Sequence, residues 1–224
     1  MGLCCAAAFS LLSLAALSPT VSNAAFVGQT ANAGNTVSAS LAVLYLRSDG
    51  PGDRTATPVL PMSTATPTVT ALPNYDTDRD LFAGLVIQKG GNGAGETDPL
   101  KYQSWSYTAP TSIVLDEPVT LDLYSSMKDF DLTKTGVVDA FLLDCTITGT
   151  GCVTIASATV TDTFWNDGIS DFVLDTFSFG TPNYTVTSGR TLRVKVESNS
   201  LSDDHQWIAY DTTAYPSNLS LGSW

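Results

Sequence analysis

The sequence predicts an all-β protein, a jelly-roll-like antiparallel β-sandwich, and three observations lead to this prediction. Short runs rich in apolar and β-branched residues recur about every 8 to 12 residues, with turn residues between them. Only three of the 22 acidic residues are glutamate, and aspartate favours turns whereas glutamate favours helices. No segment after the N-terminal stretch has a convincing helical pattern.

The N-terminal segment is expected to be a removable export signal. Residues 1–24 carry no charge, and an apolar stretch from Leu3 to Leu17 precedes Ser22-Asn23-Ala24, the small-x-small pattern after which signal peptidases cleave. A buried helix is the alternative. We therefore expect a secreted or cell-surface protein whose mature chain begins at Ala25, with residues 25–224 forming a single β-sandwich domain.

The first half of that domain is expected to hold two strands and two irregular segments. Apolar residues dominate 36–47, which predicts a buried strand. Prolines recur through 48–73, so this range is interpreted as a surface excursion with no central strand. A second strand is expected over 81–88, followed by a glycine-rich loop over 90–95.

The second half shows strand patterns at regular intervals. Leu192, Val194 and Val196 are expected to face the core, and the alternating charged residues between them are expected to face outward. The ranges 136–145 and 152–161 flank a short turn and predict a hairpin. Strands are expected over 101–108, 119–124, 136–145, 152–161, 172–179, 184–187, 191–197 and 206–211.

Charge and hydropathy exclude some partners. The net charge of −12 repels nucleic acid and anionic membranes, and it suits divalent cations or simple solubility. No apolar stretch after the signal approaches the roughly 18 residues that a membrane-spanning helix needs. We therefore expect no nucleic-acid partner and no membrane span once the signal is removed.

Two cysteines lie at the ends of the expected hairpin turn. Cys145 and Cys152 are separated by six turn-forming residues, and in an exported chain such a pair is most simply a disulfide. Closing so short a loop stabilises a fold by about 2.5 kcal/mol in the chain-entropy interpretation. A redox-active pair is the alternative, although the spacing is not Cys-x-x-Cys.

An acidic segment is a candidate calcium site. Asp76, Asp78 and Asp80 alternate as the first ligands of a calcium loop do. Leu81 stands where an EF-hand needs glycine, and no glutamate follows at the twelfth position. Both Ca²⁺ binding and a solvated acidic turn therefore remain open for this segment.

The motifs of common hydrolases are missing from the sequence. His205 is the only histidine, and neither Gly-x-Ser-x-Gly nor His-Glu-x-x-His occurs. Paired carboxylates for glycoside hydrolysis stay conceivable, but no pair stands out. These observations predict a protein without catalytic activity.

Four aromatic residues are candidates for ligand binding. Trp105, Trp165, Trp207 and Tyr210 could form a flat platform on which sugar rings stack. A sandwich core also needs large rings, so packing in the core is the alternative. Trp207 and Tyr210 are three residues apart, which in a strand places them on opposite faces.

Two segments resemble those of secreted bacterial proteins. Ala25-Phe26, the run from Asn32 to Ala39 and the apolar strand after it resemble the post-signal segment of the camelysin and TasA-like family. This resemblance implies a jelly-roll sandwich and, because several members form extracellular fibres, self-association. Residues 192–216 are similar to the closing strands of sandwich modules in bacterial surface proteins.

These observations together predict a non-catalytic structural or adhesive protein. Its expected partners are further copies of itself or polymers of the cell envelope. A carbohydrate-binding module that holds a glycan through the four rings is the alternative.

Overall fold

The computed structural model describes residues 43–48, 59–75, 83–127, 134–164 and 172–222. Strands, turns and bends make up these ranges, and none of them contains a helix. The prediction of an all-β protein is therefore confirmed for the described part of the chain. In these same ranges, no helix is long and apolar enough to cross a membrane.

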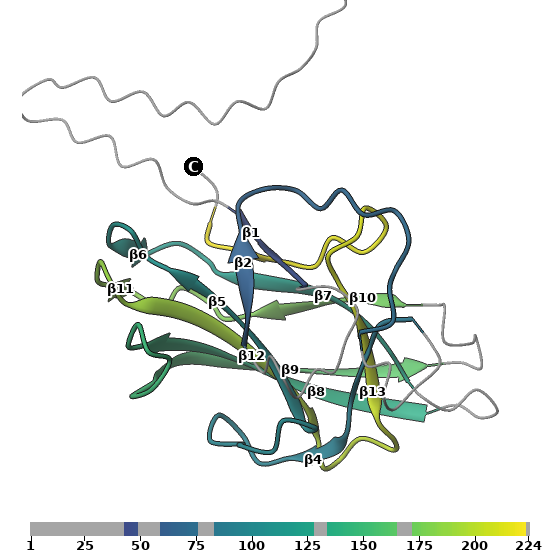
Figure 1. Ribbon diagram of the computed structural model, residues 1–224. Coiled ribbons are helices and arrows are strands. Elements are labelled where there is room, and N and C mark those ends of the chain that lie inside the picture. Colours follow the sequence, from purple (N-terminus) through teal and green to yellow (C-terminus); the bar gives the residue numbers. More distant parts are fainter. Residues whose placement is uncertain (1–42, 49–58, 76–82, 128–133, 165–171, 223–224) are drawn as a thin grey trace, which may run out of the picture. The chain divides into compact units, whose positions relative to one another are not determined.

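The described strands follow one another through the whole second half of the chain (Figure 1). Their bounds are β1 Val43–Leu46, β2 Val59–Ser63, β3 Leu85–Ile87, β4 Lys89–Gly91, β5 Tyr102–Thr108, β6 Ile113–Leu115, β7 Thr120–Met127, β8 Lys134–Cys145, β9 Val153–Phe164, β10 Val173–Ser178, β11 Tyr184–Val186, β12 Thr191–Asn199, β13 Gln206–Ala209 and β14 Asn218–Ser220. Most lie within or close to the predicted ranges.

Most strands belong to one large, mainly antiparallel sheet. Its path runs β3-β13-β7-β14-β1-β2-β5-β12-β8-β9, with β10 added beside β7 and β4 beside β12. Among the described strands, only the β2–β5 and β12–β4 pairs are parallel. The short strands β6 and β11 form a separate pair.

Strand β2 corrects the interpretation of the proline-rich segment. It lies inside residues 48–73 and joins the two halves of the large sheet, because it pairs with β1 through Ser63 and Met62 and with β5 through residues 59–61. Each partner uses only part of β2. Pro61 lacks an N–H donor, but its carbonyl still accepts a bond from Arg47 N at 3.0 Å, so the strand tolerates the proline.

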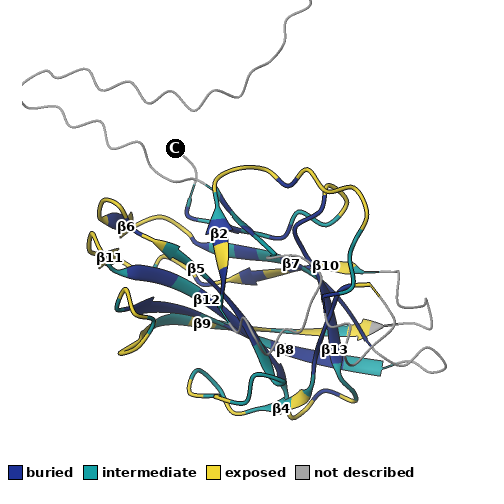
Figure 2. Ribbon diagram, viewed as in Figure 1, coloured by how far each residue is buried: buried dark blue, intermediate teal, exposed yellow. Residues whose placement is uncertain are grey.

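The core lies between the inward faces of the strands, where the buried residues of Figure 2 gather. Every second side chain of a strand faces this core. The fully buried ones include Leu121 and Leu123 of β7 and Leu192, Val194 and Val196 of β12. Each fully buried side chain of this size contributes about 1.5–3 kcal/mol by the area relation.

The opposite face of β12 differs from the expectation that its charged residues meet solvent. Arg193, Lys195 and Glu197 do point away from the core, but Lys195 and Glu197 are buried, with 4% and 0% exposure. The glycine-rich loop after β4 covers them. Lys195 Nζ donates to the carbonyls of Gly93, Ala94 and Glu96 at 3.2, 3.0 and 2.7 Å.

Glycine is required where this loop approaches the sheet. A Cβ atom at Gly91 would lie 2.6 Å from Cδ of Glu197, which is closer than packed carbon atoms come. Gly93 N donates to Glu197 Oε1 at 2.5 Å, so the carboxylate helps to hold the loop down. The sequence predicted this loop but not what it covers.

Candidate functional site

A chain of polar side chains extends through the interior at one end of the core. Three polar residues lie on inward faces: Ser125 of β7, Asp175 of β10 and Gln206 of β13. They are neighbours because β7 pairs with both β10 and β13. Ser125 Oγ donates a short hydrogen bond to Asp175 Oδ2, and Gln206 Nε2 donates to Ser125 Oγ at 3.2 Å. All three side chains are buried.

A second carboxylate reaches this group from another strand. Asp162 of β9 hydrogen-bonds the Asp175 side chain. Asp162 is only partly buried, and its Oδ1 also accepts from Thr163 N at 2.7 Å. We call Asp162, Asp175, Ser125 and Gln206 the acid chain; it leads from a partly exposed carboxylate to a fully buried amide.

The electrostatics of the acid chain favour a neutral Asp175. Burial is the largest cause, and it raises the pKa of Asp175 to about 7, against an ordinary value of 3.8. The hydrogen bond from Ser125 lowers this pKa, whereas the charge and the hydrogen bond of Asp162 raise it. With a pKa of about 7, Asp175 is protonated in about half of the molecules at neutral pH.

This arrangement can accept and release a proton. Asp162 is the member that solvent reaches, while Ser125 is fully buried and can only orient Asp175. Gln206 Oε1 is buried without a hydrogen-bond partner in the described part of the chain. A carboxyl group that titrates near pH 7 beside a second carboxylate is the kind of group from which hydrolases build acid–base sites.

Sequence reasoning missed the acid chain, although one signal was available. In the predicted strand 172–179, the period of two places Asp175 on the same face as Phe177 and Phe179. An aspartate that shares a face with two phenylalanines is a candidate buried acid. Asp162 gave no such signal, because its contact with Asp175 joins strands that are not hydrogen-bonded to each other.

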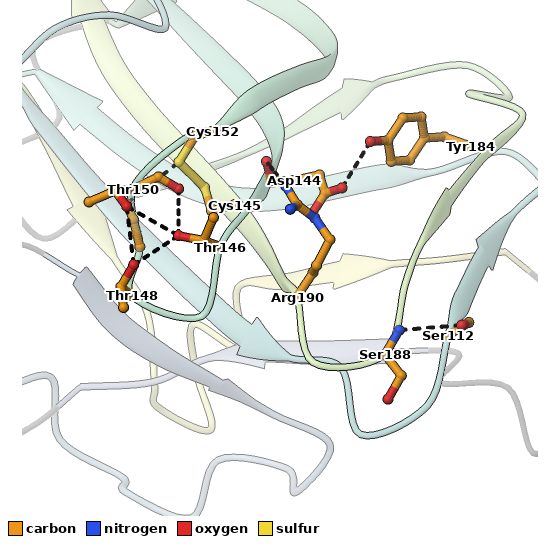
Figure 3. Close-up of polar contacts among 11 residues, drawn as sticks. Ser112, Asp144, Cys145, Thr146, Thr148, Thr150, Cys152, Tyr184, Ser188 and Arg190 are labelled. Carbon is orange, nitrogen blue, oxygen red and sulfur yellow. Dashed lines mark hydrogen bonds and ion pairs between the residues drawn. A yellow bond between two sulfur atoms is a disulfide. The ribbon is translucent and has the colours of Figure 1, made fainter.

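The predicted disulfide is present in the structure. Cys145 and Cys152 are joined with an S–S distance of 2.07 Å at the end of the β8–β9 hairpin. The loop they close carries Thr146, Thr148 and Thr150, whose hydroxyl groups lie 2.9 to 3.2 Å apart (Figure 3). This loop is called the disulfide loop below.

An ion pair between a buried Asp144 and a partly exposed Arg190 lies close to the disulfide in Figure 3. Arg190 Nε donates to Asp144 Oδ1 at 2.6 Å, and the Tyr184 hydroxyl donates to Asp144 Oδ2 at 2.8 Å. The hydrogen bond to Asp144 is the main cause that raises the pKa of Tyr184. Because Tyr184 belongs to β11, these contacts tie the small β6–β11 pair to the large sheet.

Three of the four aromatic candidates lie in the core and not on a surface platform. Trp105, Trp207 and Tyr210 are all buried, with at most 1% exposure. The Tyr210 ring stacks on Tyr75, with centroids 4.6 Å apart, and meets Trp105 edge-on at 5.0 Å. The structure thus agrees with the core-packing alternative for these three rings. Trp165 lies outside the described residues, as do the calcium candidates Asp76, Asp78 and Asp80.

The single histidine does not belong to the acid chain. His205 precedes Gln206 in the chain, and its side chain points elsewhere: Nδ1 accepts from Lys89 N at 3.3 Å. It also lies 3.8 Å from Asp204 Oδ1.

No protein-family profile matches the sequence, and no curated protein matches it. Solved structures do match. A CocE/NonD family hydrolase from Staphylococcus aureus shares 13% identity at a TM-score of 0.55, covering 80% of this chain and 35% of the hydrolase.

Two further matches have the same character. An aminopeptidase from a marine sediment Thaumarchaeota archaeon shares 9% identity at a TM-score of 0.55 over 80% of this chain and 36% of its own. An alpha-amino acid ester hydrolase shares 13% identity at a TM-score of 0.51 over 80% and 35%. The fold is thus an all-β arrangement that also occurs in hydrolases, and this chain spans about a third of their length.

These matches contradict two predictions made from the sequence. The chain was expected to be a non-catalytic structural or adhesive protein, with a carbohydrate-binding module as the alternative, and not an enzyme. The structural matches are hydrolases instead. The argument from the sequence depended on missing nucleophile and metal motifs, and their absence does not exclude an all-β arrangement that also occurs in hydrolases.

Proposed function

We propose that the protein takes part in the hydrolysis of ester or amide bonds, as a β-unit of a hydrolase, and that the acid chain supplies its proton-transfer groups. The observation that carries this proposal is the hydrogen-bonded Asp162–Asp175 pair, whose inner member has a pKa of about 7. The likeness of fold to hydrolases supports it. Because the likeness covers about a third of each hydrolase, the activity is proposed for this β-unit and not inferred from those enzymes as wholes.

The proposed reaction uses Asp162, the member that solvent reaches, as the group that exchanges protons with the substrate. Its carboxylate removes a proton from a water molecule as the water oxygen attacks the acyl carbon, and it then gives that proton to the departing oxygen or nitrogen. Asp175, which is buried beside it, keeps its own proton throughout. Ser125 and Gln206 hold Asp175 in place and do not touch the substrate.

The proposed substrates carry a positive charge near the bond that is cleaved. Two of the structurally similar proteins are an aminopeptidase and an alpha-amino acid ester hydrolase. A chain with a net charge of −12 attracts cationic molecules. Esters and amides of α-amino acids with a free, protonated amino group therefore suit this protein better than anionic substrates do.

The test is an assay of the purified protein on p-nitrophenyl esters and p-nitroanilides of α-amino acids. We expect turnover above the buffer rate, and a fall of about 100-fold or more in kcat for Asp175→Asn and Asp162→Asn. Asp122→Asn is the matched control, because Asp122 accepts from Thr176 Oγ1 at 2.7 Å on the outer face of the same two strands. Hydrolysis no faster than in buffer, or full activity in both acid-chain variants, would overturn the proposal.

We also propose that the two halves of the large sheet, which meet at β2, pack as a jelly-roll sandwich in a secreted protein. The burial of alternate residues in both halves supports the two-layer arrangement. The disulfide supports an oxidising compartment. An experimental structure tests the first point, and the mass of the mature protein, beginning at Ala25, tests the second.

A further inference from the structure

Arg193 stands out among the arginines of the described residues because it has no partner. Arg47 pairs with Asp211 at 3.0 Å, and Arg190 pairs with Asp144 at 2.6 Å. Arg193 makes no hydrogen bond or ion pair in the described ranges, and its Nε is buried without an acceptor. In a chain with 22 acidic and 10 basic residues, such a guanidinium is unexpected.

The position of Arg193 is defined by two loops on the outer face of β12. A Cβ atom at Gly149 would lie 2.6 Å from Arg193 Nη2, so the disulfide loop rests directly on the guanidinium. Gly149 lies between Thr148 and Thr150, which Figure 3 shows at the tip of that loop. On the other side, Lys195 is held under the glycine-rich loop. Ser106 of β5 is the cross-strand neighbour of Arg193.

Other polar atoms on this row of β12 also lack partners. Thr191 Oγ1 and Glu197 Oε2 are buried without a hydrogen bond in the part of the chain that the structure describes. Both residues alternate with the core residues of β12, as Arg193 does, so they share its outer face. A buried polar atom without a partner costs free energy, on the order of 1–3 kcal/mol. The donors among these atoms, Arg193 Nε and the Thr191 hydroxyl, suit a ligand that accepts hydrogen bonds.

The charge balance beside Arg193 favours an anion. Burial lowers the pKa of Arg193. Lys195 is the next residue on this face, and it lies between Arg193 and the acidic Glu197. The positive charges of Arg193 and Lys195 are close enough to affect each other.

We propose that Arg193 anchors a binding site for a carboxylate ligand on the outer face of β12, between the disulfide loop and the glycine-rich loop. The planar guanidinium matches the two oxygens of a carboxylate. The overall negative charge of the protein repels a monovalent carboxylate less than a multivalent phosphate or sulfate. This site is independent of the proposed hydrolytic function, because its residues lie outside the acid chain.

The experiment is an NMR titration that follows the Arg193 side chain. The Nε–Hε signal of isotopically labelled full-length protein is recorded while sodium acetate replaces sodium chloride at constant ionic strength. We expect a saturable shift with acetate. Arg193→Lys keeps the positive charge but loses the planar guanidinium. In this variant the backbone signals of the disulfide loop should report acetate binding that is weaker by about tenfold or more. Arg193→Gln should abolish the response of that loop, and Lys89→Gln is the control for loss of one charge.

Each outcome decides the proposal. A saturable response to acetate that Lys89→Gln keeps and Arg193→Gln loses supports it. Equal responses to acetate and chloride, or an unchanged response in Arg193→Gln, overturn it. Saturation by sulfate but not by acetate also overturns it, because the site then selects a tetrahedral anion. Removing an unpaired, half-buried charge should not unfold the protein, so the melting temperature of Arg193→Gln should equal or exceed that of the wild type.

Discussion

At the scale of single residues, the most informative group is a carboxyl that folding keeps neutral. Asp175 is 4% exposed and accepts a hydrogen bond from Ser125, while Asp162 adds a second acid beside it. Its folded pKa of about 7 lies above the ordinary value of 3.8. The folded state therefore binds a proton more tightly than the unfolded state does, and stability must depend on pH.

The stability of the protein should fall as the pH rises through this window. The contribution of Asp175 is fully present below about pH 4, decreases between about pH 4 and 7, and stays low above pH 7. Asp175→Asn is permanently neutral and can still accept from Ser125 and donate to Asp162. At pH 8 we expect the variant to be more stable than the wild type by on the order of 2–4 kcal/mol, and at pH 4 to be about equal. Urea unfolding at both pH values measures this difference.

The outer-face variant Asp122→Asn is again the control and should differ little from the wild type at both pH values. If Asp175→Asn destabilises the protein equally at pH 4 and pH 8, the aspartate is needed as an anion and the interpretation of the acid chain is wrong.

The burial of single residues could be predicted from the sequence only where apolar residues alternate along a strand with a period of two. The alternation in 191–197 correctly placed Leu192, Val194 and Val196 in the core. It also gave the direction of Lys195, but not its burial, because the covering loop comes from residues about a hundred positions away. Long-range partners of this kind, including Asp162 for Asp175, leave no local trace in the sequence.

At the scale of elements, the β8–β9 hairpin combines its own strand pairing and disulfide with contacts to residues far away in the sequence. Its strands pair along their length, and the disulfide closes its end next to the partly buried Asp144–Arg190 pair. The same loop rests on Arg193. The disulfide therefore fixes the position of one wall of the proposed anion site as well as closing the hairpin.

Removing the disulfide should cost about 2.5 kcal/mol by the loop-entropy relation. We expect the double variant Cys145→Ser/Cys152→Ser to melt about 5 to 10 °C below the wild type while still folding. The double change avoids a single free thiol that could pair between molecules. Calorimetry of oxidised wild type, reduced wild type and the variant checks this, and identical melting in all three would show that the bridge contributes no stability.

Element prediction succeeded for the long strands and for some short ones, such as β11 inside the predicted range 184–187, and it missed β6 and β14. The ranges predicted for β5, β8, β9, β10 and β12 agree closely with the structure. Strands β6 and β14 have three residues each, which is too few for a period of two to be recognised. Strand β2 was rejected because of its proline, although only the N–H of Pro61 is lost to pairing.

At the scale of the whole molecule, net charge is the dominant property. A net charge of −12 makes the compact state repel itself, and salt screens that repulsion. Raising NaCl from about 10 mM to 0.5 M should therefore raise the melting temperature, because the Debye length falls well below the size of the protein. This general effect is the background against which specific cation binding must be measured.

Calcium provides the specific case. Asp76, Asp78 and Asp80 alternate in the sequence but lie outside the described residues, so calcium binding there stays a prediction. At constant ionic strength, about 1 mM CaCl₂ should raise the melting temperature more than 1 mM MgCl₂ does, because a ligand that binds only the folded state stabilises it in proportion to the logarithm of its concentration. Asp78→Asn should remove the difference between the two cations, whereas Asp122→Asn, which takes away the same charge elsewhere, should leave it intact. Equal melting in calcium, magnesium and EDTA would show that this acidic segment is only a solvated turn, and that its contribution to the molecule is the general charge alone.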